Sequence, residues 1–178
     1  MQKRTAFLMC SVLMLSVLAV GQMANQKQRP SPAANAQCKF ADGKTIKVAY
    51  SSPRAKGRKI FGGLVPYGEP WRAGANEATT FVTSSDIVVG GTNVPAGSYT
   101  IFTVPNADKW SLVISKGTGE WGTQYPGQDK DLARVDMKDS KLPSPVENFT
   151  ISYEKSGNGC TMNIDWETTR ASVDIKGK

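Results

Sequence analysis

The chain has 178 residues, a formal net charge of +7 and no histidine. This length is sufficient for one domain with its own hydrophobic core, and the absence of histidine excludes Ser-His and Cys-His nucleophile pairs. Four basic residues lie in the N-terminal segments described next, and subtracting them from the 22 of the whole chain leaves 18 against 15 acidic residues. Such a mild excess without a long basic run indicates solubility and no nucleic-acid partner.

The N-terminus has the pattern of a secretory signal peptide, predicted over residues 1–21. Lys3 and Arg4 supply the positive charge, and residues 6–20 form an apolar run that ends in small residues suited to cleavage. The run is shorter than the ~20 apolar residues that a spanning helix needs. Too few apolar residues precede Cys10 for it to be a lipidation site. We therefore predict an exported protein, periplasmic or secreted, without stable membrane insertion after cleavage.

The next segment, residues 22–37, is rich in Gln, Asn, Ala, Ser and Pro, and this composition predicts a flexible linker. A single all-β domain is predicted over residues 38–178. Cys38 and Cys160 are the cysteines of that domain, and we predict a disulfide between them because exported proteins seldom leave thiols free. The long enclosed loop gives a stabilisation of about 4 to 5 kcal/mol in the chain-entropy model. Two distant cysteines lack the spacing of a zinc site, so neither a metal nor another cofactor is predicted.

Short runs with a period of two begin near residue 45, where Ile46, Val48 and Tyr50 share one face. Similar runs recur, bounded by turn residues, at residues 110–114, 149–153, 162–166 and 171–175. The run over residues 99–104 is apolar on both sides and should be central in a sheet. Many short strands without a helical stripe predict an antiparallel β-sandwich or a jelly-roll-like barrel.

An irregular loop over residues 57–78 combines glycine, proline, aromatic and charged residues, and is the first candidate binding surface. Its candidate ligand-binding residues are Arg58, Tyr67, Trp71, Arg72, Asn76 and Glu77. Two alternatives stay open: Arg72 and Glu77 form an ion pair that only locks the loop, and Trp71 only closes the core. The basic cluster at residues 54–59 is either a solvated strand end or a contact for an acidic partner.

A second loop, over residues 120–131, adds Trp121 and Tyr125 as candidate ligand-binding residues, which we expect to face the first loop across one end of the fold. Asp129 and Asp131 lack the further acids of a calcium loop, so no metal site is predicted there. Farther along, Asn163, Asp165 and Glu167 alternate with apolar residues, and we expect them on a solvated outer face.

The first loop, residues 94–99, Trp121-Gly122 and residues 147–151 together resemble the bacterial family known as domain of unknown function 2911. The resemblance runs from about residue 44 to about residue 175. It implies an exported bacterial protein with a β-rich domain. It carries over no activity, substrate or catalytic residue.

Three functions fit these observations. The first is an exported binding module whose loops hold a small polar or saccharide-like ligand. The second is a structural or protein-interaction domain of the cell envelope. The third is a hydrolase that uses Glu77 with a second carboxylate such as Asp136, although the absence of histidine and of a recognised catalytic motif favours a protein without enzymatic activity. The sequence specifies neither the ligand nor the oligomeric state.

Overall fold

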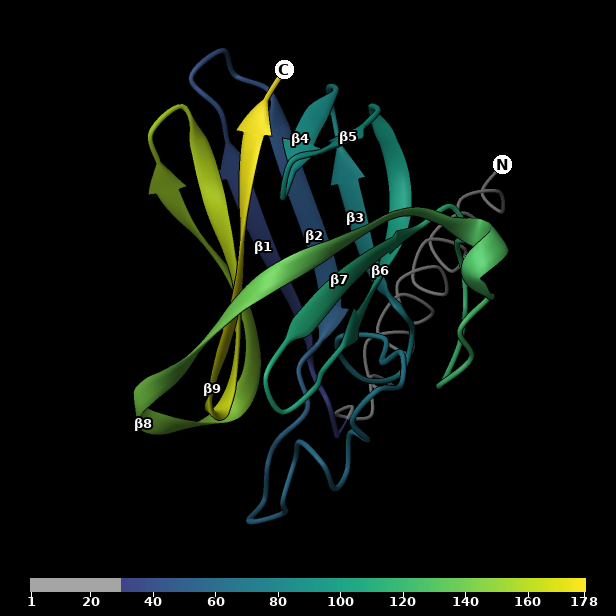
Figure 1. Cartoon of the computed structure of the whole chain (residues 1–178), viewed down its shortest axis with the longest axis vertical. Helices are drawn as coiled ribbons and strands as arrows, with labels where there is room; N and C mark the ends of the chain where they lie inside the picture. The colour runs from purple at the N-terminus through teal and green to yellow at the C-terminus, as the bar shows by residue number, and fades with distance from the viewer. Residues whose placement is uncertain (1–29) are drawn as a thin grey trace, which may run out of the picture.

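Alternating apolar and polar residues form the strands of this protein, and the computed structural model describes residues 30–178 (Figure 1). The predicted signal peptide and residues 22–29 of the predicted linker lie outside the described residues. The elements are β1 (Ala33–Lys39), β2 (Thr45–Ser51), β3 (Thr79–Thr83), β4 (Ile87–Val89), β5 (Thr92–Val94), β6 (Gly97–Val104), β7 (Trp110–Ser115), the short 3-10 helix η1 (Gln128–Lys130), β8 (Asp131–Ser156) and β9 (Gly159–Gly177).

All strand pairs are antiparallel, in the order β1-β2-β3-β6-β7-β8-β9-β4-β5. The long strand β8 joins the two parts of this sheet, because its first residues pair with β7 and its later residues pair with β9. Figure 1 shows β8 crossing the molecule and then turning back at its far end. The predicted antiparallel all-β class is confirmed.

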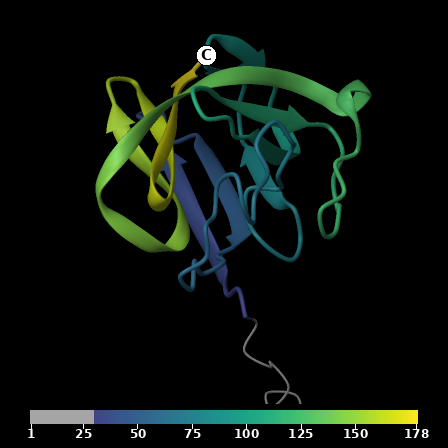
Figure 2. The same cartoon turned by 60° about the horizontal axis from the view of Figure 1, so that its bottom comes forward.

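Strand β9 also folds back on itself, as Figures 1 and 2 show. Glu167 has a φ of 51° at the bend, a left-handed conformation that suits a tight turn. On either side of the bend, the hydroxyl of Thr161 donates to Asp174 at 2.7 Å and that of Ser172 donates to Asn163 at 2.8 Å. The last two predicted strands are therefore the two arms of β9.

The central strand β6 lies between β3 and β7, as its doubly apolar sequence predicts. Tyr99 and Ile101 face the main core, whereas Phe102 and Val104 face a second, smaller cluster with Val113. Both faces of β6 are thus covered. Its position provides a rigid support for the loops at one end of the fold.

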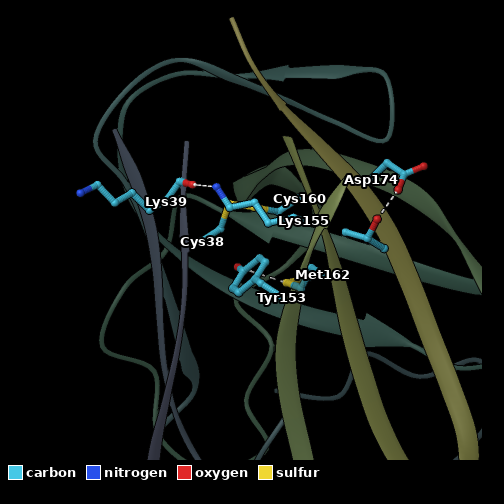
Figure 3. Close-up of a disulfide and its surroundings, with 8 residues drawn as sticks. Cys38, Lys39, Tyr153, Lys155, Cys160, Met162 and Asp174 are labelled. Atoms are coloured by element: carbon cyan, nitrogen blue, oxygen red, sulfur yellow. Dashed lines mark hydrogen bonds between the residues drawn. A yellow bond between two sulfur atoms is a disulfide. The ribbon is translucent and has the colours of Figure 1, made fainter. Parts of the chain in front are cut away.

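The predicted disulfide between Cys38 and Cys160 is present and joins β1 to β9, with 6.4 Å between the two Cα atoms (Figure 3). Beside it, the ammonium group of Lys155 donates to the carbonyl oxygen of Lys39 at 2.9 Å. The close-up also shows Tyr153 with its hydroxyl toward the sulfur of Met162. The disulfide and the Lys155 hydrogen bond therefore hold the edge strand β1 against β9 and β8, respectively.

Strand β1 begins at Ala33, so the domain starts before the boundary predicted at residue 38. Residues 33–37 pair with β2 and are not part of a flexible linker. Ala34 and Ala36 pack against the core. Their small side chains give a weak alternation signal in the sequence, and the pairing with β2 supplies the order that their composition lacks.

The expectation of a solvated outer face on β9 is wrong for two of its three residues. Asn163 and Asp165 are only 2% and 8% exposed. The guanidinium of Arg170, from the second arm of β9, donates to both Asp165 oxygens at 2.8 and 2.7 Å and also contacts Glu154 at 3.2 Å. The hydrogen bond to Asp165 raises the pKa of Arg170. Because β9 folds back, its polar side chains cover one another.

Candidate functional site

The loop between β2 and β3 lies at the end of the domain opposite the C-terminus (Figure 1) and is hydrogen-bonded to the sheet. Trp71 and Thr103 exchange two backbone hydrogen bonds of 2.7 and 2.8 Å, which attach the loop to β6. Gly74 approaches β2 so closely that a Cβ there would lie 3.0 Å from the carbonyl oxygen of Ser51. The close contact favours glycine at this position. The backbone therefore holds the loop in one place.

This loop lines a cavity of about 500 Å³, which we call the main cavity. Three of the predicted ligand-binding residues line it, namely Arg58, Trp71 and Arg72. The remaining lining comes mainly from the loop itself, together with residues before β1, in the second loop and in β9: Ser31, Pro53, Leu64, Pro66, Glu69, Pro70, Gly74, Ala75, Thr123 and Trp166. A volume of this size is in the range of small-molecule sites.

The apolar wall of the cavity is a stack of two tryptophans. The ring of Trp71 lies nearly parallel to that of Trp166, at an angle of 17° and a centroid distance of 5.7 Å. Phe149 meets Trp71 edge-on at 5.0 Å. Trp71 is half-buried, and Trp166 is buried with its indole nitrogen donating to the carbonyl oxygen of Glu147 at 3.2 Å. Trp71 thus closes the core and also lines the cavity.

Arg72 carries a charge that the described part of the chain does not neutralise. Its Nε is buried and has no hydrogen-bond partner, and among residues 30–178 no ion pair joins Arg72 to Glu77. Burial alone lowers the pKa of the Arg72 guanidinium. A partly buried cation without an acidic partner is less favourable than a paired one, so the predicted lock between Arg72 and Glu77 does not account for this arginine.

Arg58 is held differently, by the backbone of its own loop. Its guanidinium donates to the carbonyl oxygens of Ala55 at 3.0 Å and Arg54 at 2.6 Å. Arg58 also lines a neighbouring cavity of about 460 Å³ with Glu147 and Glu167. It therefore stands at the boundary between the two cavities, with its orientation fixed by the loop.

Asn76 and Glu77 turn toward β2, away from the main cavity. The amide of Asn76 donates to the hydroxyl of Ser51 at 3.1 Å and to the carbonyl oxygen of Ser31 at 3.2 Å, and Ser51 donates to Glu77 at 3.4 Å. Glu77 lines a smaller cavity of about 220 Å³. The carboxylate proposed as its catalytic partner, Asp136, is 70% exposed, contacts Lys109 at 3.0 Å and does not line that cavity.

The second loop meets the first through its backbone. The backbone of Trp121 forms a bridge with that of Glu77, and Gly122 donates to the carbonyl oxygen of Asn76 at 3.1 Å. Two residues after Trp121, Thr123 lines the main cavity. The Trp121 ring itself is 63% exposed and outside the lining.

Tyr125 and Tyr67 lie outside the main cavity. Tyr125 packs edge-on against Phe102 and donates to Asp131 at 2.6 Å. Burial, and then the neighbouring Asp131 carboxylate, raise the pKa of Tyr125 to about 12. Tyr67 is 46% exposed and lines a separate hollow of about 150 Å³ that includes Asn106. Trp166, which the sequence analysis did not single out as a ligand-binding residue, lines the cavity where Tyr67 and Tyr125 do not. The only indication of Trp166 in the sequence is its place among the inward-facing apolar residues of β9.

Two further observations describe the protein between residues 30 and 178. No group of three or more His, Cys, Asp or Glu side chains in this part is placed to hold a metal ion. No helix in the same part has the length and apolar character required to cross a bilayer.

Comparison with protein-family models gives a match over most of the chain. The family model described as "Protein of unknown function (DUF2911)" matches residues 31–175. No curated protein matches the chain. No solved structure matches it either.

Proposed function

The chain belongs to the family DUF2911, and we propose that this member is a binding protein whose cavity beside Trp71 holds a small polar or saccharide-like ligand. One observation carries the proposal: the stacked rings of Trp71 and Trp166 and the unneutralised guanidinium of Arg72 line the same cavity of about 500 Å³. An aromatic face beside a few polar groups is a common way to hold a small ring-shaped molecule.

The rigidity of the loop supports binding. Trp71 is fixed by two backbone hydrogen bonds to Thr103, and Arg58 is fixed by the carbonyl oxygens that it contacts. Side chains that are already ordered lose little conformational entropy when a ligand enters. A preformed cavity is therefore expected to bind without a large movement of the loop.

We place the protein outside the cytoplasm. The disulfide between Cys38 and Cys160 supports this location, since disulfides persist mainly in oxidising compartments. The signal-peptide pattern over residues 1–21 adds a second, independent argument. Export also fits a role in capturing a small molecule from the surroundings of the cell.

The rival function is a structural or interaction domain of the envelope. It is favoured by the packing of Trp71 against Trp166 and Phe149, which closes the core whether or not a ligand is present. It leaves Arg72 unexplained, because a purely structural arginine would be expected to have an acceptor. For this reason we prefer the binding function.

The test is a thermal-shift screen of wild-type protein and Trp71→Phe against a panel of sugars, sugar acids and other small polar metabolites. Phe keeps an apolar ring in the core but reduces the aromatic wall, so it should retain the fold and weaken the ligand-dependent rise in Tm. Circular dichroism of both proteins controls for folding. A panel in which no compound raises the Tm of the wild type would favour the envelope domain instead.

A further inference from the structure

Among the described residues, none forms an ion pair with the guanidinium of Arg72. From this we propose that the ligand of the main cavity is a small carboxylate whose negative charge pairs with Arg72. This inference rests on the proposed binding function and specifies the chemical class of the ligand.

The first step concerns the missing partner of Arg72. In residues 30–178 its buried Nε has no acceptor, whereas Arg54, Arg58, Arg134 and Arg170 all donate to oxygen atoms. Arg72 also lines the cavity, and because its Nε is shielded from solvent, an acceptor within the cavity would pair with the other guanidinium nitrogens, which have no acid partner among the described residues. A bound anion would supply the acceptor that the described protein does not supply.

The second step concerns the amount of charge. The charged residues that line the cavity are Arg58, Arg72 and Glu69, which leave one net positive charge. That balance suits a single negative charge better than a phosphate monoester, which carries between one and two negative charges at neutral pH. The planar fork of a guanidinium also matches the two oxygens of a carboxylate.

The third step concerns the rest of the ligand. The parallel rings of Trp71 and Trp166 form an apolar wall, and Arg72 follows Trp71 directly in the chain. A molecule that places a ring face on the wall and a carboxylate at Arg72 would use both features. A hexuronic acid meets this description, because it combines an apolar sugar face with one carboxylate.

The inference also predicts how Arg72 affects the fold when no ligand is bound, and a purely structural role for Arg72 predicts the opposite effect. Burial lowers the pKa of Arg72, which is the signature of a cation held where its charge is disfavoured. If no ligand is bound, replacing Arg72 by Met should keep the packing of the side-chain stem and remove an unfavourable charge. The unliganded fold should then be as stable as wild type or more stable.

The experiment combines binding and unfolding measurements on the exported domain. Isothermal titration compares D-glucuronate with D-glucose, which differ in having a carboxylate or a hydroxymethyl group, for the wild type, Arg72→Gln, Arg72→Lys and Trp71→Phe. Arg134→Gln is the matched control, because Arg134 contacts Asp131 and does not line the cavity. Benzoate and benzyl alcohol form a second pair with the same difference in charge. Urea unfolding of Arg72→Met and Arg134→Met is measured without ligand.

We expect the acid of at least one pair to bind about 10- to 100-fold more tightly than its neutral analogue, from the usual contribution of a charged hydrogen bond. Arg72→Gln should remove this preference, Arg72→Lys should retain part of it, and Arg134→Gln should leave it unchanged. The urea midpoint of Arg72→Met should not fall below that of wild type.

Three results would overturn the inference. If acids and neutral analogues bind equally well and Trp71→Phe weakens both, the cavity binds ligands but not through a carboxylate, so the proposed function survives alone. If no member of either pair binds, the carboxylate class that we propose is wrong, and the thermal-shift panel decides separately on the binding function. If Arg72→Met lowers the urea midpoint below that of wild type, Arg72 stabilises the unliganded fold, and its charge does not require a bound anion.

Discussion

Removing the disulfide should have the largest single effect on stability, and its size can be worked out from the structure. We consider the double variant Cys38→Ala/Cys160→Ala, because each cysteine is only 2% exposed and Ala places no new polar group in the core. The two cysteines are 122 residues apart. The chain-entropy relation for a loop of that length gives about 5 kcal/mol at 25 °C, and measured disulfides generally contribute about 2 to 4 kcal/mol.

The expected loss in the free energy of unfolding is therefore about 3 to 5 kcal/mol. The assay is urea unfolding followed by tryptophan fluorescence, with the midpoint and the slope compared between the variant and the wild type. Strand β1 should also become sensitive to proteolysis, because the bond ties this edge strand to β9. A loss below about 1 kcal/mol, well under the usual disulfide contribution, would refute the reasoning that the covalent link limits the unfolded chain.

Three smaller perturbations test other parts of the account. Asp165→Asn should destabilise the fold by about 1 to 3 kcal/mol in urea unfolding, because it weakens the charged hydrogen bonds to Arg170; an unchanged midpoint would mean that solvent already screens this pair. Trp121→Ala should change the free energy of unfolding by no more than about 0.5 kcal/mol and leave the ligand-dependent rise in Tm intact, since the Trp121 ring is 63% exposed and does not line the cavity. Loss of that rise in Tm would place the ring in the binding site. Ultraviolet titration should show Tyr125 ionising near its pKa of about 12 instead of 10.0, and Asp131→Asn should move the transition toward 10.0. Since the raised pKa means that folding favours the neutral phenol, the stability contributed by Tyr125 should be complete below about pH 10 and decline between about pH 10 and 12; a transition at 10.0 in both proteins would contradict this environment.

The fold class could be predicted because apolar side chains recur every second residue. Ile46 and Val48 are fully or almost fully buried, as their alternation requires. The alternation does not predict strand β1, because its inward residues include Ala34 and Ala36. Such small side chains are also common in linkers. Order in that segment comes from pairing with β2 and from the disulfide, and neither contact is local in sequence.

Alternation also failed to predict how the outer face of β9 is covered. It correctly places Asn163 and Asp165 on the face opposite the apolar residues, but it assumes a flat strand exposed to water. In the structure β9 folds back, so Arg170 and Ser172 reach these side chains from the second arm. A tight turn at Glu167, a non-glycine residue, gave no recognisable turn signal in the sequence.

The lining of the candidate cavity could be predicted from the sequence only in part. The sequence grouped Arg58, Trp71 and Arg72, and the structure brings all three to one cavity. The sequence alone does not show that Trp166 lines the same cavity, because Trp166 lies more than ninety residues from Trp71 in the chain. Nor could it show that Asn76 would bond to Ser51, since that contact depends on where the loop crosses β2.

The central claim is that the cavity beside Trp71 receives a small molecule, and a crystal structure of the protein soaked with a compound that raises its Tm tests this most directly. The account predicts electron density between the face of Trp71 and the guanidinium of Arg72. Density at another surface, with the cavity empty in the same crystal, would contradict it.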